Sequence, residues 1–352
     1  MAPNKSLIYK KYTPGWPVPG EHIAVENRPF DLEAAPPPGG ITVRNLYLSL
    51  DPYARGQIRE PDSSATYSIP WVEGEPAVLT AFSTVLKSDN PTFEPGMYVY
   101  AMTHAAEYAS LSAEFAAMSV PLPSLPDGVD IQPPTILCAL GVSGLAAYVS
   151  FFEFVKRPQC HGKTMFVSAA AGGVGQIVGQ LGKIYGMKVI GSTGSDDKVN
   201  FVVRELGFDG AWNYKTEKTP GALRRLAPEG LDYYYDNVAG EQLEAALAHM
   251  KDFGTIISSG GISQYHKLED EIYGVKTLHH FFLKRLSMHG FICSDPPLLG
   301  KYVATFSEDM VRWLVEGRLK TKEEVIQGIE NAPEAYVKMW KGDKFGKLVL
   351  QM

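Results

Sequence analysis

The sequence predicts an α/β protein in which a doubly wound parallel sheet accompanies a separate, mostly β domain. The chain has 352 residues, a length that is typical of two domains of ordinary size. Residues 1–130 are rich in proline and in short β-forming runs, such as 41–50 and 77–86. After Pro133 and Pro134 the pattern changes to apolar strands that alternate with amphipathic helices, which is typical of a parallel sheet with crossover helices.

Apolar runs in the second region are predicted as parallel strands, and the segments between them as helices. A long helix, a second helix and a final strand are predicted after Pro296. Periodicity alone does not decide whether this tail returns to the first domain. The predicted strands are 164–168, 188–192, 231–236, 254–258, 287–292 and 347–350, and the predicted helices are 173–185, 196–206, 301–316 and 332–341.

An uncharged segment, 135–152, reaches the length of a membrane span. Glycines and serines interrupt it, and no basic residues flank it in the way that orients a spanning helix. We therefore interpret it as a buried helix near a domain junction and expect no membrane partner.

Charge and cysteine content restrict the possible partners and setting. The net charge is −6 and no dense block of lysine and arginine occurs, so nucleic acid is not expected as a partner. Only Cys138, Cys160 and Cys293 are present, too few for a disulfide framework or a four-thiolate zinc site. The N-terminus lacks an apolar signal core, and we expect a cytoplasmic protein.

The most informative segment is a glycine-rich turn between the strand 164–168 and the helix 173–185. Its spacing, Ala170-x-Gly172-x-x-Gly175, matches the dinucleotide-binding fingerprint with alanine in the first place. Small residues let backbone N–H groups approach a pyrophosphate at a helix N-terminus. The predicted pyrophosphate site is Gly172, Gly173, Val174 and Gly175, and the alternative is a tight turn that is only structural.

The end of the second strand predicts the phosphorylated cofactor, NADP(H). A site that selects NAD places an acidic residue there for the ribose hydroxyls. Here the strand is followed by Gly194 and Ser195, and the nearest carboxylates begin the next helix. Ser195 and Lys198 are therefore the candidates for the 2′-phosphate, and the alternative for Lys198 is a solvated lysine on a helix face.

No metal is expected. Catalytic zinc in dehydrogenases needs thiolate and imidazole ligands, and structural zinc needs closely spaced cysteines. No cysteine precedes Cys138, and the eight histidines show no ligand spacing. A G-x-S-x-G nucleophile elbow is also absent from the sequence.

Over nearly its whole length the chain resembles a family of zinc-independent medium-chain dehydrogenases/reductases. This group contains leukotriene B4 12-hydroxydehydrogenase, the prostaglandin reductases and the plant NADP-dependent alkenal double-bond reductases. No single segment is specific, but together the matching segments are. They are Leu48-Ser-Leu-Asp-Pro-Tyr-Ala-Arg-Gly56, 141–148, 169–175, Gly194-Ser-Asp-Asp-Lys198, 213–215, Tyr235-Asp-Asn-Val-Ala-Gly240, Ser259-Gly-Gly-Ile-Ser-Gln-Tyr265 and Gly346-Lys347.

The resemblance implies a Rossmann NADP-binding domain over 135–305, inserted in a GroES-like substrate domain made of 1–134 and 306–352, and commonly a homodimer. It implies that Lys198 and Tyr214 meet the 2′-phosphate. The other cofactor contacts that it implies come from Asn237, Ser259, Gly260, Gly261, Ile262, Ser263, Phe291, Ile292 and Cys293.

The resemblance also implies the reaction. NADPH reduces the conjugated double bond of an α,β-unsaturated ketone or aldehyde, and negative charge grows on the carbonyl oxygen. Tyr265 is the expected hydrogen-bond donor to that oxygen, and Tyr53 flanks the substrate. Two alternatives stay open at this point: a ribose hydroxyl acts as the donor, or Tyr265 only packs on the cofactor.

Three departures from the family affect the expected pocket and subunit contact. Val142-Ser143-Gly144 replaces an x-Pro-Gly segment, and Lys344 stands where relatives have an asparagine just before the final Gly-Lys. The segment 266–276 replaces a proline-rich loop. We retain Lys344 as a cofactor candidate because its charge can reach a phosphate.

Two other functions fit the same sequence. The first is NADPH-dependent reduction of quinones or carbonyl groups, including oxidation of an allylic alcohol in reverse. The second, from another class, is a non-catalytic NADPH-binding protein of the crystallin-like kind.

Overall fold

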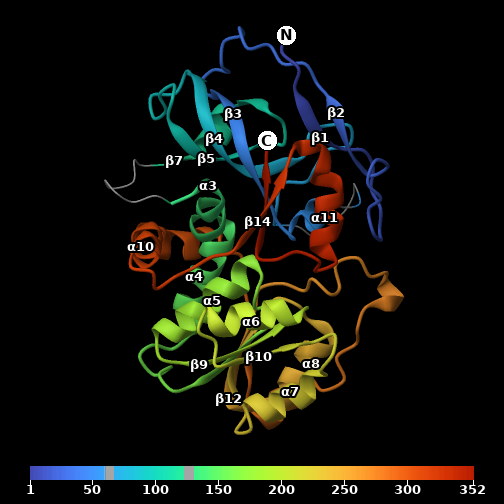
Figure 1. The fold of residues 1–352 in the computed structure, drawn as a ribbon, viewed down its shortest axis with the longest axis vertical. Helices are drawn as coiled ribbons and strands as arrows, with labels where there is room; N and C mark the ends of the chain where they lie inside the picture. Colours follow the sequence, from blue (N-terminus) through green and yellow to red (C-terminus); the bar gives the residue numbers. More distant parts are fainter. Residues whose placement is uncertain (59, 61–66, 123–130) are drawn as a thin grey trace. The chain divides into compact units, whose positions relative to one another are not determined.

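The computed structural model of the chain describes residues 1–58, 60, 67–122 and 131–352 (Figure 1). These residues form two compact units. The discontinuous unit consists of Met1–Gly141 and Glu323–Met352, and the inserted unit is Val142–Lys322. Each unit has its own sheet and its own hydrophobic core.

Both junctions differ from the expected ones after residues 134 and 305. The larger difference concerns helix α10 (Pro296–Val315), which belongs wholly to the inserted unit. It packs against α4 (Val142–Phe154), and the Tyr148 hydroxyl of α4 donates to Asp309 Oδ2 of α10 at 2.6 Å. This packing, which periodicity does not reveal, keeps residues 306–322 with the inserted unit.

The inserted unit contains a six-stranded parallel sheet in the order β10-β9-β8-β11-β12-β13. The predicted α/β class is confirmed. The short strand β10 was not predicted, and it extends the sheet by one position. The strands are β8 (Thr164–Val167), β9 (Lys188–Thr193), β10 (Gly210–Asn213), β11 (Leu231–Asp236), β12 (Met250–Ser258) and β13 (Ser287–Gly290).

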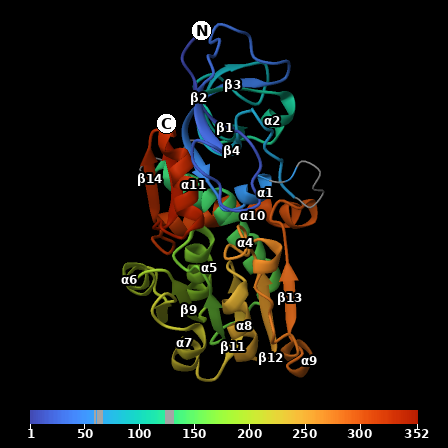
Figure 2. The ribbon, with the colours of Figure 1, turned by 90° about the vertical axis from the view of Figure 1, so that its right-hand side faces the viewer.

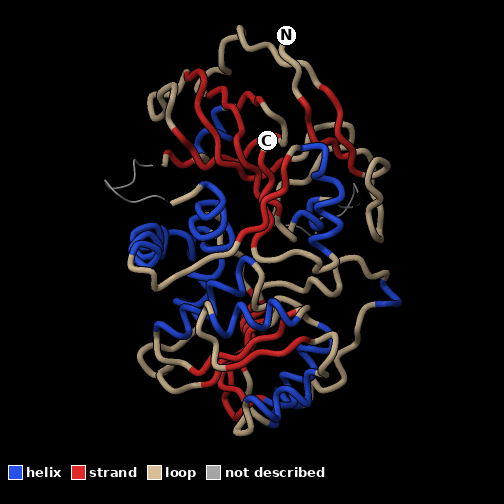
Figure 3. The backbone as a smooth tube through the Cα atoms, viewed as in Figure 1, coloured by secondary structure: helices blue, strands red, loops and turns tan. Residues whose placement is uncertain are grey.

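Helices cover both faces of this sheet (Figure 3). On one face α4 packs on α5, and on the other α7 packs on α8 over a core that includes Phe166, Trp212 and Tyr234. Crossover helices on both faces bury the central strands β8 and β11, which explains their apolar sequences. The remaining helices of the unit are α5 (Gly173–Ile184), α6 (Asp196–Arg204), α7 (Thr219–Leu226), α8 (Gly240–His249) and α9 (His280–Leu283).

The discontinuous unit contains a mixed seven-stranded sheet in the order β14-β15-β3-β4-β5-β7, with β6 paired to β3. The C-terminal strand β15 runs antiparallel to β3 and pairs Leu348 with Leu50, so the chain's tail belongs to this sheet. The strands β1 and β2 form a separate two-stranded sheet that shares its hydrophobic core with the larger one. The elements are β1 (Lys5–Tyr9), β2 (Ile23–Asn27), β3 (Ile41–Leu50), α1 (Ala54–Gln57), β4 (Val78–Ser88), β5 (Tyr98–His104), β6 (Tyr108–Leu111), α2 (Ala113–Ala117), β7 (Val120–Pro121), α3 (Pro133–Thr135), β14 (Glu323–Gln327), α11 (Ala332–Trp340) and β15 (Lys347–Gln351).

The apolar segment Pro133–Phe154 is long and apolar enough to cross a membrane by length and composition. It is 72% buried within the protein, as the core helix of a folded domain is. The helical path is interrupted at Gly141, where the backbone is extended and a Cβ atom would lie 2.3 Å from the Leu137 carbonyl oxygen. Glycine is required there, and the two units join at this residue.

Candidate active site

In the inserted unit the predicted cofactor residues follow the carboxyl ends of the parallel strands, all at the same end of the sheet (Figure 2). Ligands of open α/β sheets bind outside the carboxyl ends of the strands. The predicted residues follow β8 (Gly172–Gly175), β9 (Ser195 and Lys198), β10 (Tyr214), β11 (Asn237), β12 (259–263) and β13 (291–293).

The turn after β8 leaves no room for a side chain at Gly175, in the first turn of α5. Ala169 adopts a left-handed backbone with φ 49°, and the Ala170 amide donates to the Ser192 carbonyl of β9 at 2.9 Å. A Cβ atom on Gly175 would lie 2.4 Å from the Ala169 carbonyl oxygen and 2.9 Å from the Ala170 Cα. Only glycine fits this position, and the turn and the helix therefore pack backbone against backbone.

The N-terminus of α5 fits an anionic group. Gly172 precedes the helix with an extended backbone, and no side chain caps the first turn. The first amides of a helix have no partner within the helix, and the helix dipole makes this end favourable for negative charge. Gly173, Val174 and Gly175 provide those amides, and the pyrophosphate of a dinucleotide matches them.

The end of β9 places Ser195, Lys198 and Tyr214 near one another. The Ser195 hydroxyl accepts from the Lys198 amide at 3.4 Å and caps α6. A Cβ atom on Gly194 would lie 3.2 Å from the Tyr214 hydroxyl, so the phenol packs against this glycine. A hydroxyl and a phenol thus lie at the strand end, and Lys198 lies in the first turn of the helix that follows. Hydroxyl, phenol and ammonium groups are donors that suit a phosphate.

The two aspartates that follow serve the helix. Asp196 and Asp197 lie in the first turn of α6, where negative charge stabilises the helix dipole. Asp196 Oδ1 also accepts from the Asn213 side-chain amide at 3.0 Å. These contacts give Asp196 a structural partner.

Asp236, at the end of β11, is a buried carboxyl group to which the sequence analysis gave no role. Its Oδ1 accepts from the Tyr234 hydroxyl at 2.7 Å and from the amides of Val238 and Ala239 at 2.9 and 2.8 Å. The residue is 1% exposed, and burial raises the pKa of the carboxyl group above its usual value. Asp236 therefore shapes the turn that carries Asn237.

Hydrogen bonds join three of the loops at this end of the sheet. The Asp236 carbonyl accepts from the amides of Ser259 and Gly260 at 2.8 and 3.1 Å. The Asn237 amide donates to Ser168 Oγ, and its side-chain amide donates to the Ser168 carbonyl, both at 2.8 Å. The loops after β8, β11 and β12 are thus held as one piece.

Tyr265 lies over the loop after β12. Its hydroxyl accepts from the Gly261 amide at 3.4 Å, and a Cβ atom on Gly260 would lie 3.0 Å from the hydroxyl oxygen. Burial raises the pKa of the phenol, so it stays protonated at neutral pH. In the same loop the amides of Ile262 and Ser263 donate to the carbonyls of residues 237 and 238.

The segment after β13 differs from its predicted form. The strand ends at Gly290, two residues before the predicted end at 292, because the chain turns toward α10. The Asp295 amide donates to the Ile292 carbonyl at 3.1 Å, and Pro296 opens the helix. Phe291, Ile292 and Cys293 therefore lie in a loop beyond the carboxyl end of β13. Their backbone groups take no part in strand pairing.

The discontinuous unit holds the two remaining predicted residues. Tyr53 directly precedes α1, and burial raises the pKa of its phenol well above the usual value, with a further contribution from the charge of Asp51. The Lys344 ammonium group donates to the carbonyl of Gly346 in its own turn. This contact gives Lys344 a partner within the loop that precedes β15.

Metal-ligand clusters are absent from the described parts of the chain: no group of three or more histidine, cysteine, aspartate or glutamate side chains there is placed to hold an ion. Cys138 and Cys160 are buried, and Cys293 is partly exposed.

Comparison with known proteins identifies the family. Residues 173–316 match the family described as zinc-binding dehydrogenase, and residues 7–119 match the N-terminal domain of oxidoreductase. The chain is 42% identical to the NADP-dependent oxidoreductase RED1 of Cochliobolus heterostrophus, over 100% of this chain and 98% of that protein. It belongs to the zinc-independent medium-chain dehydrogenases/reductases, in the group of alkenal and enone reductases.

Further relatives agree on the cofactor and on the kind of bond that is reduced. The chain is 35% identical to the 2-alkenal reductase (NADP(+)-dependent) of Nicotiana tabacum, over 99% of this chain and 97% of that protein. The crystal structure of CurA from Vibrio vulnificus in complex with NADPH is 30% identical and matches with a TM-score of 0.84, over 99% of each chain. The protein is an NADP(H)-dependent oxidoreductase that acts on carbon–carbon double bonds.

Proposed function

We propose that this enzyme reduces the conjugated double bond of α,β-unsaturated ketones and aldehydes. When bound, NADPH supplies the hydride that adds to the β-carbon of the substrate. The names of two relatives support this substrate class, the 2-alkenal reductase of Nicotiana tabacum and the (+)-pulegone reductase of Mentha piperita, the latter 35% identical over 89% of this chain and 87% of that protein.

The observation that carries the proposal is the geometry of Tyr265. Its hydroxyl uses a lone pair to accept from the Gly261 amide at 3.4 Å, which leaves its own proton for donation. As the β-carbon gains hydride, charge develops on the carbonyl oxygen as an enolate. A neutral phenol that donates to this oxygen stabilises the charge where it forms, and the α-carbon then takes up a proton.

The cofactor preference rests on the end of β9. We propose that Lys198, Tyr214 and Ser195 bind the 2′-phosphate that distinguishes NADPH from NADH. The Ser195 cap at the N-terminus of α6 and the phenol of Tyr214 beside Gly194 support this assignment.

Identification of products tests the proposed reaction. The protein is incubated with NADPH and a panel of enals, enones and quinones, and the products are identified by mass spectrometry and NMR. Saturated ketones and aldehydes support the proposal. Allylic alcohols or hydroquinones as the only products favour carbonyl or quinone reduction, and tight NADPH binding without turnover favours a non-catalytic binding protein.

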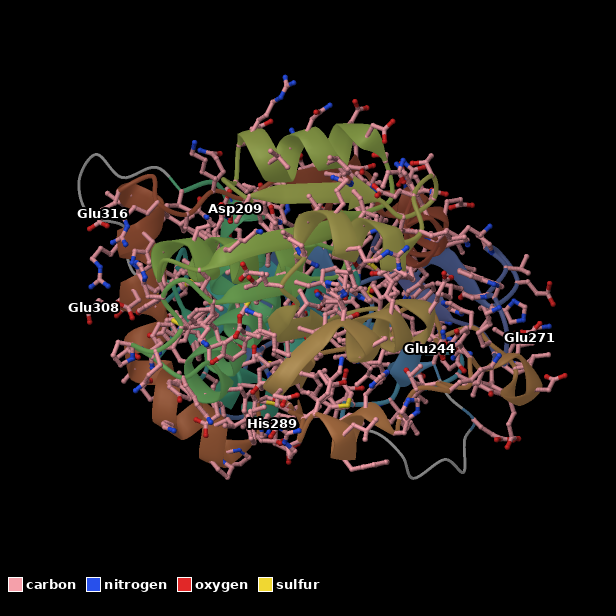
Figure 4. All side chains as sticks on the ribbon, turned by 90° about the horizontal axis from the view of Figure 1, so that it is seen from below. Asp209, Glu244, Glu271, His289, Glu308 and Glu316 are labelled. Atoms are coloured by element: carbon pink, nitrogen blue, oxygen red, sulfur yellow. The ribbon has the colours of Figure 1, made fainter. Side chains whose placement is uncertain are left out.

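We also propose that the enzyme forms a homodimer through strand β13. This strand lies at the end of the sheet order and pairs only with β12 among the described strands. All four of its residues are exposed, including Met288, and the nearby Phe282 and Leu283 are exposed as well. His289 of the same strand, labelled in Figure 4, stacks on Phe154 with ring centroids 4.8 Å apart. An unpaired strand edge with exposed apolar side chains beside it is a site where a second copy can add its own strand.

Light scattering tests this dimer with Met288→Lys, which places a charge on the open edge. We expect the wild-type protein to be a dimer and this variant to be a monomer. A wild-type monomer, or a variant that stays dimeric, contradicts the assignment of β13.

A further inference from the structure

A buried ion pair joins the C-terminal strand to the end of β3. Because β15 pairs Leu348 with Leu50, Lys347 and Asp51 are the next opposed pair in the same register. Lys347 Nζ lies 2.8 Å from Asp51 Oδ1, and the two side chains are only 3% and 7% exposed. The residues are 296 positions apart in sequence.

The pair is built into the segment that leads to Tyr53. Lys347 Nζ also donates to the Leu50 carbonyl at 2.6 Å, and the second carboxylate oxygen of Asp51 accepts from the Ser49 hydroxyl at 2.5 Å. Beyond Asp51, the indole N–H of Trp340 donates to the Pro52 carbonyl at 3.1 Å. The C-terminal segment thus holds residues 50, 51 and 52, the three residues directly before Tyr53.

Stability alone does not account for a buried ion pair. The cost of removing two charges from water offsets most of their attraction, and apolar residues of similar volume often stabilise a protein as well or better. Unlike apolar residues, the ion pair makes directional hydrogen bonds: the Lys347 ammonium group donates to one carboxylate and to one carbonyl. Its contacts define the path of the backbone at the start of the turn.

We propose that the Lys347–Asp51 ion pair is the positioning device for Tyr53, holding the turn so that the phenol lies where the substrate requires it. The inference rests on the proposed function and on the expectation, from the family resemblance, that Tyr53 flanks the substrate. Tyr53 follows Asp51 by two residues, and the charge of Asp51 acts on the phenol. Lys347 and Asp51 are positioning residues, and they act through Tyr53.

A double-mutant cycle tests this proposal on the full-length enzyme. The isosteric double variant Asp51→Asn/Lys347→Met removes both charges together and leaves no unpaired buried ion. We expect kcat for enone reduction to fall about tenfold in this double variant, and by a similar factor in Tyr53→Phe. The affinity for NADPH, measured by fluorescence titration, is expected to stay unchanged.

The deciding measurement combines the changes. In the Tyr53→Phe background, the double variant should lower kcat by no more than about twofold, because residues that act through one another do not add. If the two effects multiply, the pair does not act through Tyr53 and the inference is overturned. If Tyr53→Phe alone leaves kcat unchanged, the inference also fails, while saturated products in the same assay still uphold the proposed reaction.

A second variant covers the possibility that the double variant does not fold. Lys347→Arg keeps the charge but replaces the compact ammonium with a wider planar group, and thereby shifts the turn. We expect a folded enzyme with lowered kcat and unchanged NADPH affinity. Adding Tyr53→Phe should not restore kcat. A Lys347→Arg enzyme with the wild-type kcat contradicts the proposal.

Discussion

The loops at the carboxyl ends of the strands in the inserted unit are built differently from the turn in the discontinuous unit that leads through residues 50–52 to Tyr53, the Tyr53 turn. At the carboxyl ends of the strands, each loop begins where its own strand ends, and most contacts come from backbone groups or glycines. The Tyr53 turn is fixed by side chains of a strand and a helix almost 300 positions further along the chain. A site assembled from local backbone geometry tolerates few substitutions at its glycines, whereas a site assembled from distant side chains depends on their charge and reach.

The largest expected effect is the loss of NADPH affinity on substitution of Gly175, where backbone atoms leave no space for a side chain. Gly175→Val adds a Cβ atom at a position only 2.4 Å from the Ala169 carbonyl oxygen, so the turn must move. We expect NADPH affinity to fall by about 100-fold or more in fluorescence titration. Gly221→Ala is the control, because a Cβ atom on Gly221 meets no atom within 4 Å. Equal NADPH affinity in the two variants would falsify the backbone-packing account.

A smaller effect, confined to turnover, is expected at Tyr265. Tyr265→Phe removes the hydroxyl and retains the ring, so kcat for enones should fall about 100-fold while NADPH binding is retained. Tyr273→Phe, in the segment that follows, is the matched control and should keep its kcat. If kcat of Tyr265→Phe equals that of the wild type, another group stabilises the enolate.

Lys198 tests the cofactor preference at the end of β9. Lys198→Ala should raise the KM for NADPH about tenfold and leave the KM for NADH nearly unchanged, because only NADPH carries the 2′-phosphate. Lys188→Ala, at the opposite end of the same strand, should change neither constant. A similar increase in both KM values for Lys198→Ala would show that the lysine does not recognise the phosphate.

The smallest expected effect is the pH dependence of stability that Asp236 contributes. Its pKa in the folded protein is raised above the ordinary 3.8, so the folded state binds the proton more tightly than the unfolded state does. The contribution of this group to the free energy of unfolding is fully present below pH 3.8. It is lost as the pH rises through the pKa of the folded state. Asp232 and Glu324, with lowered pKa values, act in the opposite direction, so the variant must be compared with the wild type.

Urea denaturation across this pH range measures the difference. The free energy of unfolding of the wild type minus that of Asp236→Asn should decrease as the pH rises. If this difference in the free energy of unfolding stays constant or increases as the pH rises, ionisation of Asp236 does not destabilise the folded state.

The sequence was most informative where structure is local. The turn at Gly172–Gly175 and the strand β11 lie where spacing and apolar runs predicted them. The strand β10 was missed because four residues, Gly210–Asn213, carry too little periodicity to be recognised. Helix α10 begins at Pro296, five residues before its predicted start at 301, since proline is well accommodated in a first turn.

Two features of the site needed the tertiary structure. Asp236 stands in a segment that resembles the family, but its role depends on amides and on a hydroxyl that only the folded loop places around it. Lys347 and Asp51 each stood in a segment that resembles the family, yet no sequence pattern shows that β15 pairs with β3. A carboxylate at the end of a buried strand is the signal that points to Asp236 in advance.

One isotope experiment tests the central claim, the reduction of a conjugated double bond, most directly. The enzyme is incubated with an α,β-unsaturated ketone and NADPH that carries deuterium at the transferred position of its nicotinamide. The account predicts a saturated ketone with deuterium on the β-carbon. An allylic alcohol with deuterium on the former carbonyl carbon would contradict it.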